Sequence, residues 1–291
     1  MSGKTVLITG ASDGIGKATA RDIAKRNARV ILACRNVGKA NKVAEEIKAE
    51  TGNFNIIVKA LDLCSFESVR KCAEDVLSTE DKLHVLINNA GIVGPQTREV
   101  TEDGCEKVMQ SNHFGHFLLT LLLLDLLKKS APSRIINVSS VAYAFGKINI
   151  DDLNHEKTKY HYMNVYSNSK LANIYFTREL ASRLAGTGIT VNTLHPGVVK
   201  TNIFFSSEGF YSTISKFMVF VLGKTSEEGA QTTIYLAVHP DVQRITGKYF
   251  SDCKEEKLQS WVPNRALERL FFESSEKVVG LTMKEASKTI S

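Results

Sequence analysis

The sequence predicts an α/β protein with a single doubly wound parallel sheet of about seven strands and helices on both faces. Three observations predict it. Short runs rich in apolar and β-branched residues alternate with segments of helical period along most of the chain. The helical segments are long enough to cross from one parallel strand to the next. Strands such as 85–87 are apolar throughout, as expected for a sheet that is covered on both faces.

The N-terminal half already shows this alternation clearly. Each predicted strand is an apolar run, and the third helix begins at Ser65, a residue type that caps helices, with Glu67 and Ser68 in its first turn. The strands are predicted at 6–9, 29–34, 55–61 and 83–88, and the helices at 15–27, 38–50 and 65–78.

The C-terminal half continues the pattern. Its longest apolar stretch, 114–127, has 14 residues, whereas a membrane span needs about 20, so we expect a buried helix around 111–129. No linker rich in Pro, Gly or Ser and no repeat divides the chain, which predicts one domain over 1–253 and a helical tail over 254–291. The remaining strands are predicted at 134–139, 190–194 and 244–250, and the remaining helices at 165–185 and 226–237.

The composition excludes several classes of protein. With 43% hydrophobic and 23% charged residues, the 291-residue chain has enough apolar material for a core, which argues against disorder. A net charge of +6 is a mild excess, and we expect no nucleic-acid partner. The five cysteines are odd in number and form no C-x-x-C, which favours a reducing compartment and no metal site. Because a strand begins at Thr5, we expect a cytoplasmic protein without a signal peptide or N-terminal anchor.

A glycine-rich loop joins the first strand to the first helix. Glycines let the backbone approach a pyrophosphate, and the helix N-terminus offers free N–H groups and a partial positive charge. This strand–loop–helix context favours a dinucleotide site over a simple tight turn, and it makes the predicted sheet Rossmann-type. The loop residues expected to bind the cofactor are Gly10, Ser12, Asp13, Gly14, Ile15 and Gly16.

The end of the second strand indicates which dinucleotide is bound. Proteins that prefer NAD place Asp or Glu there to bind the ribose 2′-hydroxyl. This chain has Cys34 and then Arg35, whose guanidinium makes charge-assisted hydrogen bonds with a 2′-phosphate. The sequence therefore favours NADP(H), although Asp13 adds an unfavourable charge and a solvated surface arginine is the alternative.

Candidate catalytic residues follow later in the chain. Tyr166 and Lys170 are four residues apart on a predicted helix, so they share one face. A lysine ammonium next to a tyrosine favours the phenolate and lowers the tyrosine pKa, which suits acid–base catalysis near neutral pH. Ser140 follows the strand at 134–139, at the carboxyl edge of the sheet where such folds bind ligands.

Together these residues resemble the short-chain dehydrogenase/reductase family. The resemblance covers residues 3–250, and its motifs occur in the family's order and spacing. They are Thr9-Gly10-x-x-x-Gly14-Ile15-Gly16, Asp62-Leu63, Asn88-Asn89-Ala90-Gly91, Asn112, Ser140, Tyr166-x-x-x-Lys170 and Pro196-Gly197.

The resemblance implies a role for each of these positions. Tyr166 would be the general acid/base, and Lys170 would bind the nicotinamide ribose and depress the tyrosine pKa. Ser140 would hydrogen-bond the substrate carbonyl, and Asn112 would hold a water that relays protons to Lys170. The further cofactor contacts that it implies are Asp62 and Leu63 at the adenine, Asn89, Ala90 and Gly91 beneath the cofactor, and Pro196, Gly197, Val199 and Thr201 at the nicotinamide.

A closer resemblance involves four longer stretches: 33–36, 112–117, 169–173 and 194–199. They are similar to the retinol dehydrogenase 11–14 subgroup, which includes retinal reductases and is typically anchored by an N-terminal hydrophobic segment. This similarity implies NADP(H)-dependent reduction of a lipophilic aldehyde or ketone, with retinal to retinol foremost. A steroid or general carbonyl reductase, and a non-catalytic lipophile-binding protein, are the alternatives.

The same family places a mobile substrate lid at residues 203–222. Aromatic and aliphatic side chains dominate this segment, which suits a lipophilic small-molecule substrate. Packing in the core, or peripheral contact with an intracellular membrane aided by the net positive charge, are alternatives. The family often dimerises through helices corresponding to 111–129 and 165–185, which leaves a homodimer open. Three histidines lack the spacing of metal ligands, and we interpret them as structural: His113, His116 and His195.

Overall fold

The computed structural model describes residues 1–199, 223–262 and 264–281 of the chain. Over these ranges eight strands form one sheet. The strand predicted at 244–250 is shorter, because Gly247 has a φ of +73° and turns the backbone just before it. The strands are β1 (Thr5–Thr9), β2 (Arg29–Cys34), β3 (Ile56–Ala60), β4 (Val85–Asn88), β5 (Ser133–Val138), β6 (Ile189–His195), β7 (Tyr249–Ser251) and β8 (Lys254–Glu255).

The sheet confirms the predicted fold class. Its strand order is β3-β2-β1-β4-β5-β6-β7-β8. The strands from β3 to β7 are all parallel to their neighbours, and β8 adds an antiparallel edge that the sequence analysis did not predict. The order reverses between β1 and β4, and in such sheets ligands bind outside the carboxyl ends of the strands at this switch point.

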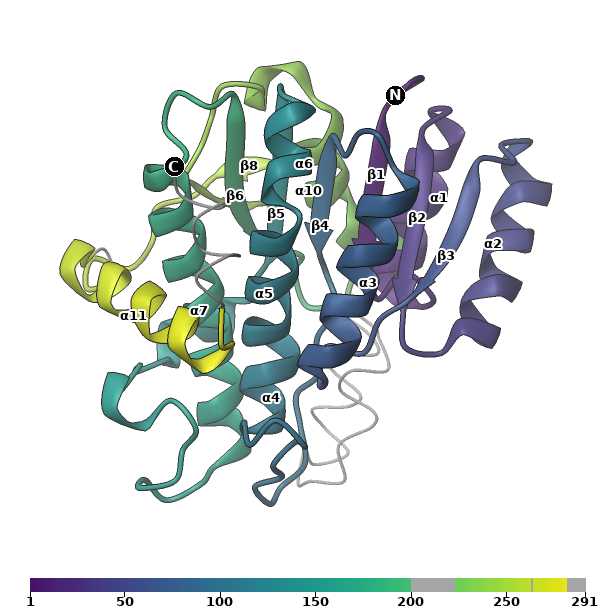
Figure 1. The fold of residues 1–291 in the computed structure, drawn as a ribbon. Helices are drawn as coiled ribbons and strands as arrows, with labels where there is room; N and C mark the ends of the chain where they lie inside the picture. The colour runs from purple at the N-terminus through teal and green to yellow at the C-terminus, as the bar shows by residue number, and fades with distance from the viewer. Residues whose placement is uncertain (200–222, 263, 282–291) are drawn as a thin grey trace.

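Helices cover both faces of the sheet (Figure 1). Side chains cap the first three of them: Asp13 accepts from Gly14, Asn36 from Lys39, and Ser65 from Ser68. The main helices are α1 (Gly14–Lys25), α2 (Val37–Thr51), α3 (Phe66–Thr79), α7 (Tyr162–Arg183), α10 (Ser226–Val238) and α11 (Arg265–Val278), and the short 3₁₀ segments are η2 (Val141–Phe145), η3 (Ile150–Asp152) and η4 (Pro240–Val242).

The long helix predicted at 111–129 is interrupted. It consists of α4 (Lys107–Met109), the π-helical turn η1 (Gln110–Phe114), α5 (Gly115–Leu122) and α6 (Leu124–Lys129). Leu123, with φ −92° and ψ 1°, breaks the helix inside an unbroken leucine run, where no Gly or Pro could have signalled it. The π turn carries Asn112 and His113, whose side chains bond outside the helix.

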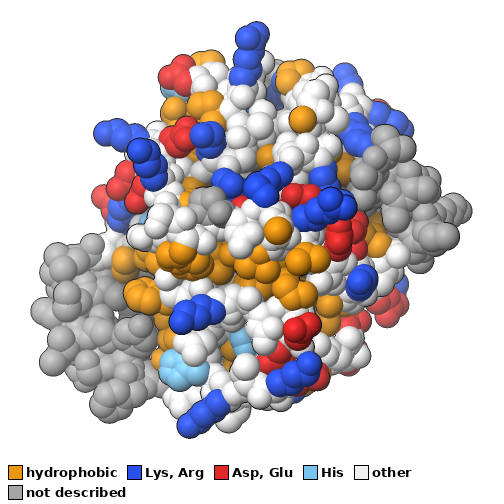
Figure 2. All heavy atoms as spheres, turned by 90° about the vertical axis from the view of Figure 1, so that its left-hand side faces the viewer, with side chains coloured by type: hydrophobic (Ala, Val, Ile, Leu, Met, Phe, Trp, Pro, Cys, Tyr) orange, Lys and Arg blue, Asp and Glu red, His pale blue; other side chains and the backbone are white. Residues whose placement is uncertain are grey.

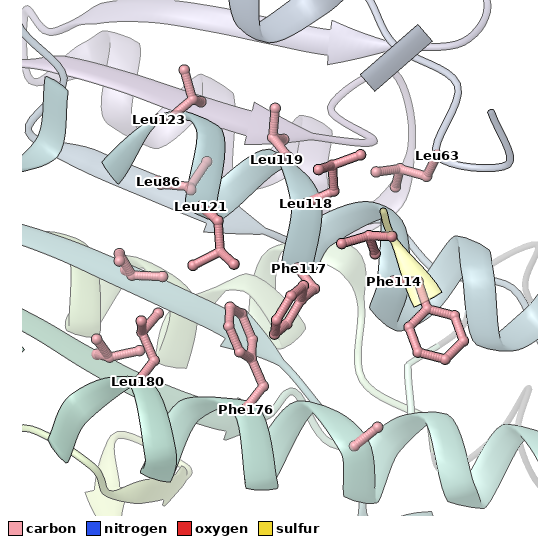
Figure 3. Packing of buried hydrophobic residues seen from close by; sticks show 14 of the residues in the cluster. Leu63, Leu86, Phe114, Phe117, Leu118, Leu119, Leu121, Leu123, Phe176 and Leu180 are labelled. Carbon is pink, nitrogen blue, oxygen red and sulfur yellow. The ribbon is translucent and has the colours of Figure 1, made fainter. Parts of the chain in front are cut away.

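One of the two large apolar clusters lies between the sheet and helices α5, α7 and α11. Phe117 and Phe176 face each other between α5 and α7, with ring centroids 5.0 Å apart (Figure 3). Phe272 of α11 completes this cluster with its ring 4.9 Å from that of Phe117. The C-terminal helix therefore belongs to the core.

Helix α11 lies across α7 at one side of the molecule (Figure 1). Glu268 is fully buried and pairs with Arg178 of α7 at 2.6 Å. The Arg183 guanidinium lies 4.0 Å from the centre of the Phe272 ring. On this side, apolar side chains form a band with Lys and Arg side chains on either side of it (Figure 2).

The described residues contain neither a membrane-spanning helix nor a cluster of metal ligands. In residues 1–199, 223–262 and 264–281, no helix is long and apolar enough to cross a membrane. The same ranges contain no group of three or more His, Cys, Asp or Glu side chains that could hold a metal ion.

Replacing Phe117 with alanine tests the contribution of this cluster. The ring is fully buried between three elements, so Phe117→Ala is expected to lower the free energy of unfolding by about 3–5 kcal/mol, measured by urea denaturation. Phe54→Ala is the matched control, because that ring is 78% exposed, and its effect should stay within about 0.5 kcal/mol. Equal effects of the two changes would contradict the packing described here.

Candidate active site

A cleft of about 480 Å³ opens at the carboxyl ends of the strands, where the strand order reverses. It brings together the phosphate loop, the end of β2, the residues after β3 and the residues after β4. The predicted cofactor residues that line it are Gly10, Ser12, Asp13, Gly14, Ile15, Gly16, Arg35, Asp62, Leu63, Asn89, Ala90 and Gly91. Further residues in its wall are Ala33, Cys34, Asn36, Lys39, Leu61, Cys64, Ile92 and Ser111.

The phosphate loop requires glycine for two different reasons. Gly10 and Gly14 have φ values of +66° and +50°, a conformation that other residues rarely adopt. A Cβ on Gly16 would overlap the Gly10 carbonyl oxygen and lie 2.6 Å from Asn89 Nδ2. The loop therefore packs tightly against the end of β4 and leaves the N-terminus of α1 open toward the cleft.

Asp13 has a cationic partner that the sequence analysis missed. One carboxylate oxygen accepts the Gly14 N–H at 2.8 Å, and the other accepts a hydrogen bond from Lys39 Nζ at 2.6 Å. Lys39 lies in the first turn of α2, four residues after Arg35 in the sequence, so this spacing is the signal that could have identified it. The unfavourable charge expected of Asp13 is thus balanced by Lys39.

Thr9, at the end of β1, holds the two strands at the switch point together. Its hydroxyl oxygen accepts the N–H groups of Asn89 and Ala90 at 2.9 and 3.0 Å. The hydroxyl also lies 2.8 Å from His116 Nε2, and His116 Nδ1 lies 3.2 Å from the Asn112 carbonyl oxygen. Burial lowers the pKa of His116 to about 4, so its ring is neutral, with Nδ1 donating to Asn112 and Nε2 accepting from Thr9.

Asn112 uses its whole side-chain amide to hold neighbouring segments. Nδ2 donates to the Ile92 carbonyl at 2.8 Å and to Ser169 Oγ at 3.0 Å, while Oδ1 accepts the Ile92 N–H at 2.8 Å. A Cβ on Gly91, in the wall of the cleft, would lie 3.4 Å from Asn112 Oδ1 and 3.2 Å from Lys170 Nζ. The side chains of Asn112 and Lys170 therefore lie next to Gly91, behind the wall of the cleft.

Tyr166, Lys170 and Ser140 gather at the end of β5. The tyrosine and the lysine are 6% and 3% exposed, and Lys170 Nζ lies 5.5 Å from the centre of the Tyr166 ring. Lys170 Nζ donates to the Val138 carbonyl at 3.4 Å. Ser140 begins η2, where its hydroxyl accepts the Ala142 N–H at 3.2 Å.

The pKa values at this cluster correct one expectation. Burial raises the pKa of Tyr166, and a hydrogen bond with the Ser140 side chain opposes that rise only in part. Burial also lowers the pKa of Lys170 to about 8. The predicted net lowering of the tyrosine pKa by Lys170 is therefore wrong for this structure, since burial of the phenol dominates.

The predicted residues after β6 lie partly in the described chain. Gly197 has a φ of +88° and packs against the Lys224 side chain, and Val199 packs against Gly229 of α10. Pro196 directly follows β6. Thr201 and the lid predicted at 203–222 lie outside the described residues, as does the end of the predicted tail, 282–291.

Comparison with known proteins identifies the family. A sequence profile described as short chain dehydrogenase matches residues 4–209, more than half of the chain. The chain belongs to the short-chain dehydrogenase family. This short-chain dehydrogenase is 47% identical to mouse retinol dehydrogenase 14, over 97% of the chain and 87% of that protein. It is 49% identical to human retinol dehydrogenase 12, over 91% and 82%.

Solved structures of other proteins agree with this fold. An uncharacterised protein from Mycobacterium paratuberculosis is 30% identical, with a TM-score of 0.75 over 96% of this chain and 94% of its own. A short-chain dehydrogenase from Escherichia coli CFT073, solved in complex with NADPH, is 28% identical, with a TM-score of 0.70 over 87% and 98%. The chain is thus an oxidoreductase similar to retinol dehydrogenases, in a family that uses NAD(P).

The cleft of this short-chain dehydrogenase fits such a dinucleotide. Added Cβ atoms would fill the loop at Gly10 and Gly16, and the α1 N-terminus beside it is suited to a pyrophosphate. Two cationic side chains, Arg35 and Lys39, lie in the same wall.

Replacing Gly16 with alanine tests this fit. Because the added Cβ displaces the loop, Gly16→Ala is expected to raise the dissociation constant for NADPH about 100-fold, measured by fluorescence titration. Gly38→Ala is the control, since a Cβ there would make only an ordinary 3.6 Å contact with Asn36. That change should leave NADPH binding unaltered and stabilise α2 by up to about 1 kcal/mol. Unchanged binding by Gly16→Ala would contradict the role of the loop.

Proposed function

We propose that this short-chain dehydrogenase is an NADP(H)-dependent reductase of lipophilic aldehydes or ketones, with retinal, reduced to retinol, as its foremost substrate. The observation that carries the proposal is the cluster of the buried Tyr166 and Lys170 with the half-buried Ser140, in which Lys170 lies against the cleft wall at Gly91. The similarity to retinol dehydrogenases 12 and 14 supports the lipophilic substrate.

The proposed chemistry uses two hydroxyl groups of the protein. When bound, NADPH supplies the hydride. Ser140 and Tyr166 donate hydrogen bonds to the carbonyl oxygen of the substrate, and Tyr166 transfers its proton as negative charge develops there. Because burial raises the pKa of Tyr166, the phenol is protonated near neutral pH. This protonated state suits a proton donor, which the reduction of a carbonyl requires.

Lys170 and Asn112 complete the proposed proton path. Lys170 binds the nicotinamide ribose, and its pKa of about 8 lets it release a proton more readily than an exposed lysine does. The Asn112 side chain is occupied by Ile92 and Ser169. We therefore propose that the relay water is held by the main-chain carbonyl of Asn112, whose oxygen has a second lone pair beside the bond from His116.

The proposed preference for NADP(H) rests on Arg35 and Lys39. Both line the cleft beside the end of β2, and Lys39 already neutralises Asp13. Because Lys39 offsets the charge of Asp13, the Arg35 guanidinium is left to bind a 2′-phosphate. The other proposed contacts are Gly10, Ser12, Asp13, Gly14, Ile15 and Gly16 at the pyrophosphate, Asp62 and Leu63 at the adenine, Asn89, Ala90 and Gly91 beneath the cofactor, and Pro196, Gly197, Val199 and Thr201 at the nicotinamide.

We propose an intracellular, reducing location for the protein. All five cysteines are free, and burial raises the pKa of Cys72 and Cys105 to about 12, which makes these thiols poor nucleophiles. These observations support the cytoplasm.

We also propose that the face carrying α11 makes peripheral contact with a membrane. The apolar band of Figure 2, together with the half-exposed Trp261 and Leu270, supports this contact. Cosedimentation with anionic lipid vesicles is expected, and full recovery in the supernatant would contradict it. Since α11 covers part of α7, we propose that any homodimer uses a different surface.

A panel of carbonyl compounds tests the function. Oxidation of NADPH, followed by its absorbance, is expected with all-trans-retinal. If the protein is instead a steroid or general carbonyl reductase, NADPH is oxidised mainly with steroid ketones or general aldehydes. Tyr166→Phe should lower kcat at least about 100-fold, because the proton donor is lost, while NADPH binding remains. A Tyr166→Phe protein with full turnover would contradict the proton assignment. Binding of retinal without NADPH consumption would instead indicate a carrier.

A charge substitution tests the cofactor preference. Arg35→Ala is expected to raise the KM for NADPH about 10-fold or more and to leave that for NADH nearly unchanged, because only the 2′-phosphate contact is lost. Arg26→Ala is the control, since that arginine pairs with Asp22 at the end of α1. A wild-type preference for NADH would overturn the assignment of Arg35.

A further inference from the structure

The Val138 carbonyl oxygen is shared by two side chains of α7. Lys170 Nζ donates to it at 3.4 Å, and Asn173 Nδ2 donates to it at 3.2 Å. Val138 is the last residue of β5 and stands two residues before Ser140. Ser139 adds a second link, since its hydroxyl donates to the Lys170 carbonyl at 2.7 Å. Asn173 therefore fixes the acceptor that holds the lysine ammonium and the strand end that carries Ser140.

The Asn173 amide is itself oriented by a buried histidine. Because Nδ2 faces Val138, the Asn173 Oδ1 atom needs a donor, and His113 Nδ1 lies 3.3 Å away. His113 is fully buried, and burial lowers its pKa to about 3, so the ring is neutral and Nδ1 carries its only N–H. His113 Nε2 is then an acceptor. The Ser275 hydroxyl of α11 lies 3.2 Å from it and shares its one proton between Nε2 and the Phe271 carbonyl oxygen, which is 2.8 Å away.

These groups form a continuous polar chain from the C-terminal helix to the active site. It runs from Ser275 through His113 and Asn173 to the Val138 carbonyl, and each of these three side chains is buried. Helix α11 lies beyond residues 4–209, the part of the chain that the family profile matches.

The surroundings of this chain are aromatic. The His113 ring lies 4.9 Å from that of Phe271 and 5.1 to 5.9 Å from those of Phe114, Phe117 and Phe176. An apolar ring would fill the space without a need for hydrogen-bond partners, whereas a buried polar ring costs stability unless it is satisfied. A histidine is therefore useful at this position because its ring can donate a hydrogen bond to Asn173 and accept one from Ser275.

We infer that Asn173 is a positioning residue for Lys170 and Ser140, and that α11 orients it through Ser275 and His113. This inference rests on the proposed catalytic role of Lys170. Asn173 touches neither substrate nor cofactor; it acts through the Val138 carbonyl. The C-terminal helix is thereby part of the support of the active site.

The first experiment replaces Asn173 with leucine, which keeps the branched shape of the side chain and removes both hydrogen bonds. With NADPH and the best aldehyde of the panel, kcat is expected to fall about tenfold, the effect of one misplaced buried hydrogen bond on a reacting group. The KM for the aldehyde should stay within about twofold, since the substrate pocket is intact. Wild-type kcat in Asn173→Leu would overturn the inference.

Asn53→Leu is the matched control. Asn53 is a buried asparagine whose amide donates to the carbonyls of Ala24 and Ala28, far from the cluster at Val138. Its loss should lower the melting temperature as much as that of Asn173 does, with kcat unchanged. If both variants lose kcat in proportion to their lost stability, the role of Asn173 is merely structural and the inference fails.

A double-mutant cycle tests the link to α11. His113→Phe removes the N–H while keeping an aromatic ring. Ser275→Ala is a smaller change, and it tests the same link if His113→Phe or Asn173→Leu does not fold. Each should lower kcat about threefold to tenfold in the wild type and have little further effect in Asn173→Leu, because the orienting bond acts only through that amide. Additive losses of kcat would overturn the link.

Lys170→Met separates this inference from the proposed function. If Lys170→Met keeps its kcat, the proposed catalytic role of Lys170 and the inference that rests on it fail together, while NADPH-dependent reduction itself still stands. If Lys170→Met loses turnover and Asn173→Leu does not, the proposed function stands and the inference alone is overturned.

Discussion

The reversal of strand order between β1 and β4 is the constraint on which the rest of the site depends. The chain leaves these neighbouring strands toward opposite faces of the sheet, so their carboxyl ends separate and a cleft forms between the loops that follow. The Thr9 hydroxyl then ties the two strand ends together by accepting two N–H groups of the β4 loop. Gly16 of the phosphate loop is needed because the loop packs so tightly against the end of β4 that a Cβ has no room there.

Buried polar groups hold this edge of the sheet in one arrangement. His116 links Thr9 to Asn112, Asn112 links the loop after β4 to α7, and Asn173 links α7 to the end of β5. A low-dielectric interior penalises any arrangement in which one of these groups loses its partner. The catalytic side chains consequently sit on elements whose relative positions are fixed by hydrogen bonds as well as by packing.

The sequence was most informative where local chemistry decides the structure. The parallel sheet follows from apolar strands alternating with helices, and the phosphate loop follows from its glycines, so the fold class and the lining of the cleft could be anticipated. The break at Leu123 and the π turn carrying Asn112 could not, because neither depends on a local stop signal. Lys39 and Asn173 were missed because their partners, Asp13 and Val138, are distant in sequence.

The position of α11 near the end of the chain also affects how the protein folds during its synthesis. This helix is synthesised after every other helix and strand that the structure describes, yet Phe271, Phe272 and Ser275 complete the cluster around His113. Domains generally fold as units, and the residues that line the dinucleotide cleft leave the ribosome well before α11 does. The aromatic cluster around His113 cannot close until α11 has been made, which makes this interval the stage at which a chaperone would protect the chain.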